Sequence, residues 1–134
     1  MNVWIVEDDA GYRRNLRMSL ELAEGIAVGR VFPSCIEFFD ALESEMPPDV
    51  VLMDLGLPGM SGIEAIRKLS THSPGVAVMV LTVFKEKDTV MEALKAGAAG
   101  YLLKGSDGPE IIKALHEVVG GGSMLSPSVA GLLK

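Results

Sequence analysis

The feature that most constrains the fold is a regular alternation of short apolar runs with longer amphipathic segments along the whole chain. The runs are rich in β-branched residues and too short for helices, which favours buried strands. They lie at Val3–Val6, Ile26–Phe32, Val50–Met53, Val76–Leu81 and Gly100–Leu103. Because parallel strands are joined by right-handed helical crossovers, five such repeats predict an α/β fold, a parallel sheet with helices on both faces.

The segments between the runs carry the start and stop signals of helices. Ser34, Ser61 and Asp107 each precede a Glu three residues later, which is the pattern of a helix N-cap. Gly97 is expected to end the fourth helix, because glycine is the usual C-cap residue. Apolar residues recur at helical spacing at Tyr12, Leu16 and Leu20, at Ile36, Phe39 and Leu42, and at Ile111, Leu115, Val118 and Val119.

Composition excludes several classes of protein. A length of 134 residues fits one domain, and no apolar run approaches the ~20 residues of a membrane span. A net charge of −6 argues against direct binding of nucleic acid, which depends on Lys and Arg. The single cysteine, Cys35, cannot form an intramolecular disulfide and is expected to be a small apolar filler near a helix start. With no basic signal-peptide start, these features predict a cytoplasmic protein.

Polar side chains follow the strands at one edge of the predicted sheet. They are Glu7, Asp8 and Asp9 after the first strand, Asp54 after the third, Thr82 after the fourth and Lys104 after the fifth. Ligands of open parallel sheets bind outside the carboxyl ends of the strands, so we expect these groups to meet there. Any one of them alone would be an ordinary cap, turn residue or surface lysine, and Asp9 is expected to cap the first helix. Their joint occurrence is the informative observation.

The acids at this edge require a counter-charge. Two carboxylates ~4 Å apart repel by ~4 kcal/mol at an effective dielectric constant of about 20. Mg²⁺ binds carboxylates, water and phosphate oxygens, so Glu7, Asp8 and Asp54 are predicted to share one such ion. Asp54 is then a plausible nucleophile toward a phosphoryl group. Lys104 would neutralise charge on the transferring group, and the Thr82 hydroxyl would donate a hydrogen bond to it.

The sequence resembles the receiver domain of two-component response regulators over nearly the whole chain. The matching segments are residues 3–9, 50–62, 81–82 and 96–104, and the acid at 54 followed by Leu-Gly-Leu-Pro-Gly-Met-Ser-Gly is the most specific. The resemblance implies a flavodoxin-like five-stranded parallel sheet of order 2-1-3-4-5. It implies phosphorylation of Asp54, ligation of Mg²⁺ or Mn²⁺ by Glu7, Asp8, Asp54 and the backbone carbonyl of Gly56, and phosphoryl contacts from Thr82 and Lys104.

The resemblance also implies a switch and shows where this chain departs from the family. Tyr101 matches an aromatic position that moves inward after Thr82 on phosphorylation, although it can equally be a half-buried core tyrosine. Gly105 stands where many members have proline after a cis bond, so the Lys104–Gly105 bond is expected to be trans or strained. Gly56 and Phe84 match positions that control the access of water to the acyl phosphate. Gly56 has no side chain to orient water and Phe84 can shield the site, which predicts slow dephosphorylation.

The C-terminal segment begins with three glycines at 120–122, which are expected to end the last helix. Residues 1–120 are therefore predicted to form the receiver, and 121–134 a linker or the start of a connector. Residues 125–133 resemble the connector to a LuxR-type helix-turn-helix domain, so the chain is either a receiver cut from a longer transcription factor or a stand-alone receiver with a vestigial tail. The implied partners are a histidine kinase or phosphotransfer protein, a second copy on phosphorylation, and DNA only through the output domain, with no membrane.

Other functions agree less well with the residues. A phosphohydrolase of the haloacid dehalogenase type carries a second Asp two residues after its nucleophile, and here that residue is Gly56. An interaction module that works without phosphorylation often loses part of the polar set, which is intact here. A flavin or dinucleotide protein would show a Gly-x-Gly-x-x-Gly or phosphate-loop motif, and none is present. We therefore expect a signalling switch rather than an enzyme, catalysing only its own phosphorylation and dephosphorylation.

Overall fold

Six parallel strands form one sheet in the computed structural model, which describes residues 1–134, and the strand order is β2-β1-β3-β4-β5-β6. The strands are β1 (Asn2–Val6), β2 (Ala27–Phe32), β3 (Val50–Met53), β4 (Ala77–Thr82), β5 (Gly100–Leu103) and β6 (Met124–Leu125). The helices are α1 (Ala10–Glu21), α2 (Cys35–Ser44), α3 (Gly62–His72), α4 (Lys87–Ala96), α5 (Gly108–Val119) and α6 (Pro127–Leu132). The predicted order of the first five strands is confirmed.

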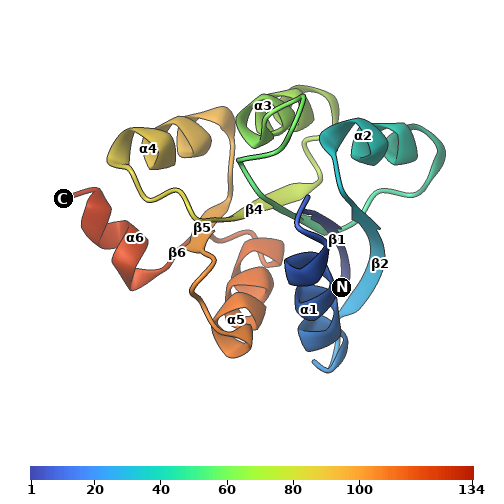
Figure 1. Ribbon diagram of the computed structural model, residues 1–134, viewed down its shortest axis with the longest axis horizontal. Helices are drawn as coiled ribbons and strands as arrows, with labels where there is room; N and C mark the ends of the chain where they lie inside the picture. The colour runs from blue at the N-terminus through green and yellow to red at the C-terminus, as the bar shows by residue number, and fades with distance from the viewer.

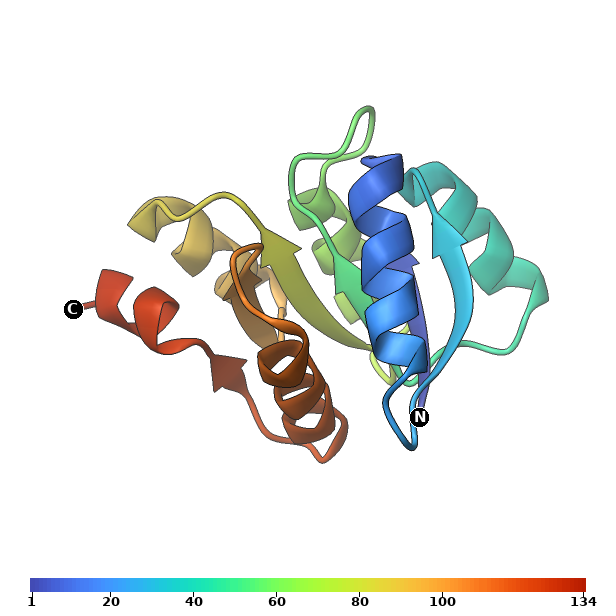
Figure 2. The ribbon, with the colours of Figure 1, turned by 60° about the horizontal axis from the view of Figure 1, so that its bottom comes forward.

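The helices cover both faces of the sheet, as the alternation predicted. Figure 1 shows α2, α3 and α4 on one side and α1 and α5 on the other, and Figure 2 shows α1 and α5 in front of the strands. Each face has its own apolar cluster, one centred on Trp4 and Phe38 and the other on Leu20 and Leu115. Every residue of the central strand β3 is buried, which explains why its sequence is continuously apolar. No helix of this fold is long and apolar enough to cross a membrane.

Side-chain caps begin the helices where the sequence predicted them. Ser34, Ser61 and Asp107 each accept a hydrogen bond from the backbone N–H three residues on. Asp9 caps α1 in the same way, because its carboxylate accepts from the Tyr12 N–H at 2.9 Å. Gly97 ends α4 with a φ of 122°, a conformation that L side chains rarely adopt. These local signals therefore fix where the helices begin or end, and the parallel pairing of the strands brings their carboxyl ends to one edge of the sheet.

The predicted apolar face of α2 is wrong by one residue. Ile36 is 60% exposed, whereas Cys35 and Phe38 are fully buried and Phe39 is only partly buried. Apolar residues come in adjacent pairs along this helix, so the sequence allows two faces one residue apart. Edge-on packing of Phe38 against Trp4 and Phe32 selects between them. Val119 was also predicted to lie on an apolar helix face, but it is 39% exposed at the end of α5. Cys35 is the buried filler that was predicted, and burial raises the pKa of its thiol to about 12.

The sixth strand and the short helix after it were not predicted. β6 pairs with β5, with Met124 opposite Gly100 and Leu125 opposite Tyr101. The pairing requires a glycine at 100, because a Cβ there would lie 2.6 Å from the Met124 carbonyl oxygen. In Figure 1, α6 lies beside β6 and on the same side of the sheet as α4. Val129 of α6 is fully buried in the Trp4–Phe38 cluster, which also contains Tyr101. A two-residue strand has no periodicity that a sequence pattern could reveal.

Candidate functional site

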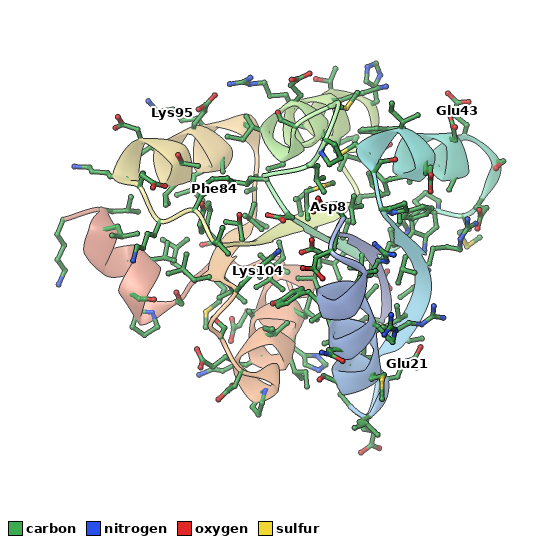
Figure 3. All side chains as sticks on the ribbon, in the orientation of Figure 1. Asp8, Glu21, Glu43, Phe84, Lys95 and Lys104 are labelled. Carbon is green, nitrogen blue, oxygen red and sulfur yellow. The ribbon has the colours of Figure 1, made fainter.

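Three carboxylates meet at the carboxyl edge of β1 and β3. Glu7 and Asp8 directly follow β1, and Asp54 directly follows β3, which is the neighbour of β1 in the sheet. One oxygen of each side chain lies within 4.8 Å of the others, so the three could hold a metal ion. Glu7 and Asp54 are buried, whereas Asp8 is exposed at the mouth of the site (Figure 3). The structure therefore brings together the acids that the sequence pattern placed at this edge.

Lys104 supplies the positive charge of the site. It follows β5, and its Nζ lies 2.6 Å from Glu7 Oε1 and 3.1 Å from Asp54 Oδ2. Its side chain is only 17% exposed, so these ion pairs are shielded from water more than surface pairs are. One ammonium between two buried carboxylates, with Asp8 beside them, leaves an excess of negative charge. The arrangement is therefore suited to a divalent cation.

Burial and the neighbouring charges together shift the pKa values of Glu7 and Lys104. Burial is the largest influence on Glu7 and raises the pKa of its carboxyl group, and the nearby Asp54 acts in the same direction. The contacts with Lys104 and the Asp9 N–H oppose burial without overcoming it. For Lys104, burial disfavours the charge, but the contacts with Glu7 and Asp54 together outweigh it and raise the pKa of the amine. Lys104 is thus held as an ammonium ion between acids that it does not fully neutralise.

Asp54 is held in one orientation by the backbone that follows it. Its Oδ1 accepts a hydrogen bond from the Leu55 N–H at 2.7 Å and a longer one from the Gly56 N–H at 3.4 Å. Its Oδ2 faces Lys104. The loop then returns to α3, where the Gly62 N–H donates to the Leu55 carbonyl at 3.2 Å. A Cβ on Gly62 would overlap the Asp54 carbonyl oxygen and lie 2.7 Å from Leu55 Cα. The close approach of α3 to the acid therefore requires glycine at position 62.

Thr82 and Tyr101 lie on the neighbouring strands β4 and β5, two residues apart in register, and both are more deeply buried than the acids. Thr82 ends β4 and is fully buried, and its Oγ1 accepts a hydrogen bond from the Phe84 N–H at 3.5 Å, near the upper limit for such bonds. Tyr101 is also fully buried, and its hydroxyl donates to the Phe84 carbonyl oxygen at 2.6 Å. Burial above all, with smaller effects of Glu86 and Asp54, raises the pKa of Tyr101 to about 12. The Tyr101 side chain therefore points into the core and is more deeply buried than the half-buried core tyrosine considered from the sequence.

Phe84 packs over Gly56 beside the acids. A Cβ added to Gly56 would lie 2.9 Å from Phe84 Cε2, so the ring fills the space that a side chain at 56 would need. The ring is 39% exposed and lies in the loop before α4, as Figure 3 shows. The bond between Lys104 and Gly105 is trans, as are all other peptide bonds of the chain. Of the two alternatives that the sequence left open for this loop, the structure has the trans one.

Two residues at the site were missed by the sequence analysis. Tyr12 was interpreted only as part of the apolar face of α1, yet its ring lies 4.6 Å from the Lys104 Nζ. Arg13 donates from Nη1 to the Glu7 backbone carbonyl at 2.5 Å. Both lie in the first turn of α1, which Asp9 caps. The available signal was their position five and six residues after Glu7, where the capped helix turns side chains back toward the site.

Comparisons of the sequence with known proteins agree with this geometry. The family described as "Response regulator receiver domain" matches residues 3–116. The response regulator GacA of Pseudomonas aeruginosa is 37% identical over 131 residues, covering 97% of this chain and 60% of GacA. The nitrate/nitrite response regulator protein NarL of Escherichia coli is 31% identical, covering 98% of this chain and 60% of NarL. The chain thus spans about 60% of the length of these curated relatives.

Solved structures have the same fold. The isolated receiver domain of RcsB from Salmonella enterica serovar Typhimurium, solved with phosphomimetic beryllofluoride, superposes with a TM-score of 0.91 at 28% identity, over 100% of this chain and 99% of that one. A LuxR-family two-component response regulator from Aurantimonas sp. SI85-9A1 superposes with a TM-score of 0.92 at 31% identity, over 98% and 94% of the two chains. The chain therefore belongs to the response regulator receiver domains of two-component systems, and its relatives are LuxR-family regulators.

Proposed function

We propose that this chain is a phosphoryl-accepting switch that is phosphorylated on Asp54, in a Mg²⁺-dependent reaction with a histidine kinase or phosphotransfer protein as donor. The supporting observation is the joint placement of the charged groups. Three carboxylate oxygens lie within 4.8 Å of one another, and the Lys104 ammonium lies between two of these acids. A lone exposed acid would support only a cap or a surface charge. A buried acid beside two further acids and a lysine supports charge-stabilised phosphoryl transfer.

The residues present fit a hard divalent cation. Glu7, Asp8 and Asp54 offer only oxygen atoms, and two of these side chains are buried with incomplete neutralisation. We propose that they hold Mg²⁺ or Mn²⁺ together with the backbone carbonyl of Gly56. When bound, the ion supplies positive charge that offsets the repulsion among the acids and the incoming phosphoryl group.

The chain's own residues would carry the transfer. An oxygen of the Asp54 carboxylate forms a bond to phosphorus while the bond from phosphorus to the donor atom breaks, and the electron pair leaves with the donor. The hydrogen bonds from the Leu55 and Gly56 N–H groups keep the carboxylate turned toward the open edge of the sheet. Lys104 is within reach of Asp54 and would pair with the transferred group. The Thr82 hydroxyl would donate a hydrogen bond to it.

Incubation with a small acyl phosphate tests this function. With Mg²⁺ present, we expect one phosphoryl group per chain, detected as a slower band on a mobility-shift gel and removed by hydroxylamine, which cleaves acyl phosphates. With a chelator in place of Mg²⁺ we expect no modified chain. Equal modification with the chelator would contradict the metal requirement, and no modification under either condition would contradict the function itself.

We propose that Thr82 and Tyr101 transmit the modification. Thr82 would turn its hydroxyl toward the phosphoryl group, and the space it leaves favours the inward position of Tyr101. The Tyr101 hydroxyl already bonds to the Phe84 carbonyl of the β4–α4 loop, so phosphorylation would stabilise an arrangement that the unmodified chain can adopt. The Thr82 Oγ1 would exchange its long contact with the Phe84 N–H for a charge-assisted one.

Phe84 is expected to slow the loss of the phosphoryl group. Its ring lies against Gly56, and neither of these two residues has a polar side chain that could orient an attacking water. Replacing Phe84 by Ala or by Glu is therefore expected to shorten the lifetime of the phosphorylated chain several-fold. The lifetime is measured by following the decay of the modified chain after removal of the donor.

The matched control for Phe84 is Leu22→Ala. It also removes a large exposed apolar side chain, 90% exposed, but at the opposite end of α1 from the acids. The phosphorylated form of the Leu22→Ala chain should have the same lifetime as that of the chain without substitutions. An unchanged lifetime in both Phe84 variants would show that the ring does not control access of water.

We propose that residues 1–120 form the receiver and 121–134 the start of a connector to an output domain. The chain's relatives extend well beyond this length, and RcsB has been solved in complex with DNA. Leu125 pairs with Tyr101 in the sheet, and Val129 is buried in the cluster that contains Tyr101. The connector would therefore sense the switch directly. Any DNA contact of the full protein would come from the output domain, and a second copy could join on phosphorylation, since RcsB dimers have been solved on DNA.

Val129→Asp tests whether the connector docks on the switch. A buried, unpaired carboxylate costs several kcal/mol, which equals or exceeds the stabilisation that a buried valine contributes. We therefore expect residues 124–132 to detach from the sheet while the rest of the receiver stays folded. Amide hydrogen exchange should then be fast in this segment alone. Ala130→Asp, at an exposed neighbouring position, should leave exchange unchanged.

In the chain without substitutions, phosphorylation should alter the amide hydrogen exchange of residues 124–132. If exchange there is identical with and without the phosphoryl group, the connector does not sense the switch.

A further inference from the structure

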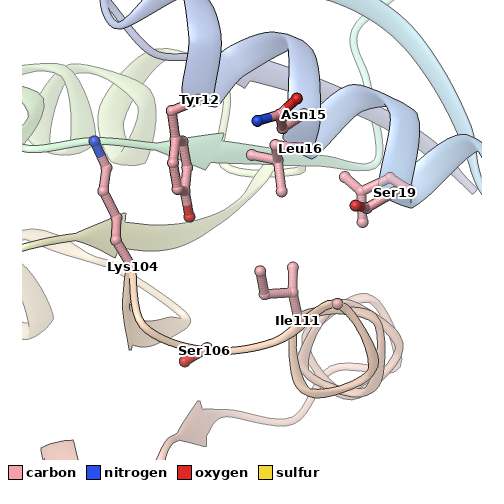
Figure 4. Close-up of a pocket in the computed structure, with 9 residues that line it drawn as sticks. Tyr12, Asn15, Leu16, Ser19, Lys104, Ser106 and Ile111 are labelled. Carbon is pink, nitrogen blue, oxygen red and sulfur yellow. The ribbon is translucent and has the colours of Figure 1, made fainter.

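Tyr12 occupies a fixed position against the lysine of the site. Asp9 caps α1 by accepting from the Tyr12 N–H, so the backbone of Tyr12 is held directly after the acids of β1. From there the ring reaches across to β5, and its centre lies 4.6 Å from the Lys104 Nζ (Figure 4). The ring is partly buried, and burial is the largest influence raising the pKa of its hydroxyl. This is the geometry of a cation–π contact in a partly desolvated site.

The contact completes the surroundings of the ammonium. Lys104 carries three N–H donors, and two of its neighbours are the carboxylate oxygens of Glu7 and Asp54. The third neighbour is the face of the Tyr12 ring. Tyr12 and Lys104 together also line an open groove, with Asn15, Ser19 and Ser106 among its other residues. The ring face therefore covers the ammonium where no carboxylate does.

We propose that Tyr12 is a positioning residue for Lys104 in phosphoryl transfer. This inference depends on the proposed function and deepens it. When Glu7 turns to a metal ion and Asp54 to phosphorus, Lys104 loses both anionic partners at the moment it must reach a phosphoryl oxygen. The neutral ring face remains and still attracts the cation. A carboxylate in the place of the ring would compete with the phosphoryl group for the ammonium, whereas an aliphatic side chain would not hold it.

Two substitutions separate the ring from its hydroxyl. Tyr12→Phe keeps the π face, so its maximal rate of phosphorylation should stay within about twofold of the rate of the chain without substitutions. The rate is measured in saturating Mg²⁺ with a small acyl phosphate. Tyr12→Leu keeps apolar bulk but removes the π face, and the maximal rate should fall about three- to tenfold, the range of a partly desolvated cation–π contact. Asn15→Ala, in the same groove but away from the Lys104 amine, should leave the rate unchanged. The proposal is wrong if the Tyr12→Leu variant is phosphorylated as fast as the chain without substitutions, or if the Tyr12→Phe variant is as slow as the Tyr12→Leu variant.

A spectroscopic measurement on the same variants does not depend on turnover. The ε-methylene protons of Lys104 lie near the ring and should show an upfield ring-current shift in NMR. The Tyr12→Phe variant should keep this shift, and the Tyr12→Leu variant should lose it. The shift should persist when beryllofluoride and Mg²⁺ are added as a mimic of the phosphoryl group. Its loss on addition would show that Lys104 leaves the ring and would overturn the proposal. Failure of all chains to phosphorylate, with the shift present in the free protein, would instead overturn the proposed function.

Discussion

Replacing Asp54 by Asn is expected to abolish phosphorylation completely under conditions in which the unmodified chain takes up one phosphoryl group. An amide oxygen is neutral and a far weaker nucleophile than a carboxylate, and it also removes one charge from the proposed metal ligands. Asn can still accept the Leu55 N–H hydrogen bond, so the loop should keep its conformation. The expected result is a chain that folds normally and shows no modified species by intact-mass spectrometry.

The control for this result must remove an acid without touching the site. Asp40 lies at an exposed position of α2, and the Asp40→Asn variant should be phosphorylated to the same extent as the chain without substitutions. Thermal unfolding gives a second check. Since Asp54 and Glu7 share one ammonium, removing one carboxylate should leave the melting temperature of the metal-free chain unchanged or raise it. Modification of the Asp54→Asn chain at full yield would show that another residue accepts the phosphoryl group.

Gly62→Ala is expected to be the most damaging single-methyl change near the site. A Cβ at 62 would overlap the Asp54 carbonyl oxygen and lie 2.7 Å from Leu55 Cα, and both obstacles are backbone that cannot rotate away. We expect a loss of about 2–3 kcal/mol in the free energy of unfolding, as for overpacking in a close-packed core. We also expect slower phosphorylation, because relief of the clash must move the backbone that orients Asp54. Urea unfolding and the phosphorylation assay measure the two effects.

Gly75→Ala is the matched control for this substitution. Gly75 lies in the turn before β4, with no heavy atom within 4 Å of an added Cβ and no positive φ. An alanine there should be neutral or should stabilise the fold by about 0.4–1 kcal/mol, through the reduced freedom of the unfolded chain. If Gly62→Ala cost no more than Gly75→Ala, the close approach of α3 to the Asp54 backbone would not be a constraint on the fold.

These expectations share one physical basis. The buried acids of the site destabilise one another, and the fold retains them because Lys104 partly offsets their charge. If the proposed divalent ion binds, Lys104 and the ion would be alternative counter-charges for the same carboxylates. With the acids held in this way, the Lys104 ammonium would be free to pair with a phosphoryl oxygen. Gly62 and Tyr12, which hold the backbone and the lysine in place, are therefore expected to affect function although neither carries the reacting charge.

The sequence alone determined those features whose signals are local. Ser34, Ser61 and Asp107 could be identified as caps because the capping bond spans three residues. The parallel sheet followed from the alternation of apolar runs and helices. The convergence of Glu7, Asp54 and Lys104 could be predicted because the carboxyl ends of parallel strands share one edge. The roles of these residues in phosphorylation and metal binding remain predictions for the experiments above.

Only the tertiary structure decided the features that depend on packing between distant segments. Which face of α2 is buried depends on Phe38 meeting Trp4 and Phe32, and the paired apolar residues of the helix allow either choice. The strand β6 forms because Gly100 admits the Met124 carbonyl, a contact between segments more than twenty residues apart. The Tyr12 ring meets Lys104 because the first turn of α1 and the end of β5 both lie at the carboxyl edge of the sheet. A sequence pattern records the preferences of each segment, whereas these contacts arise from the shape that all the segments make together.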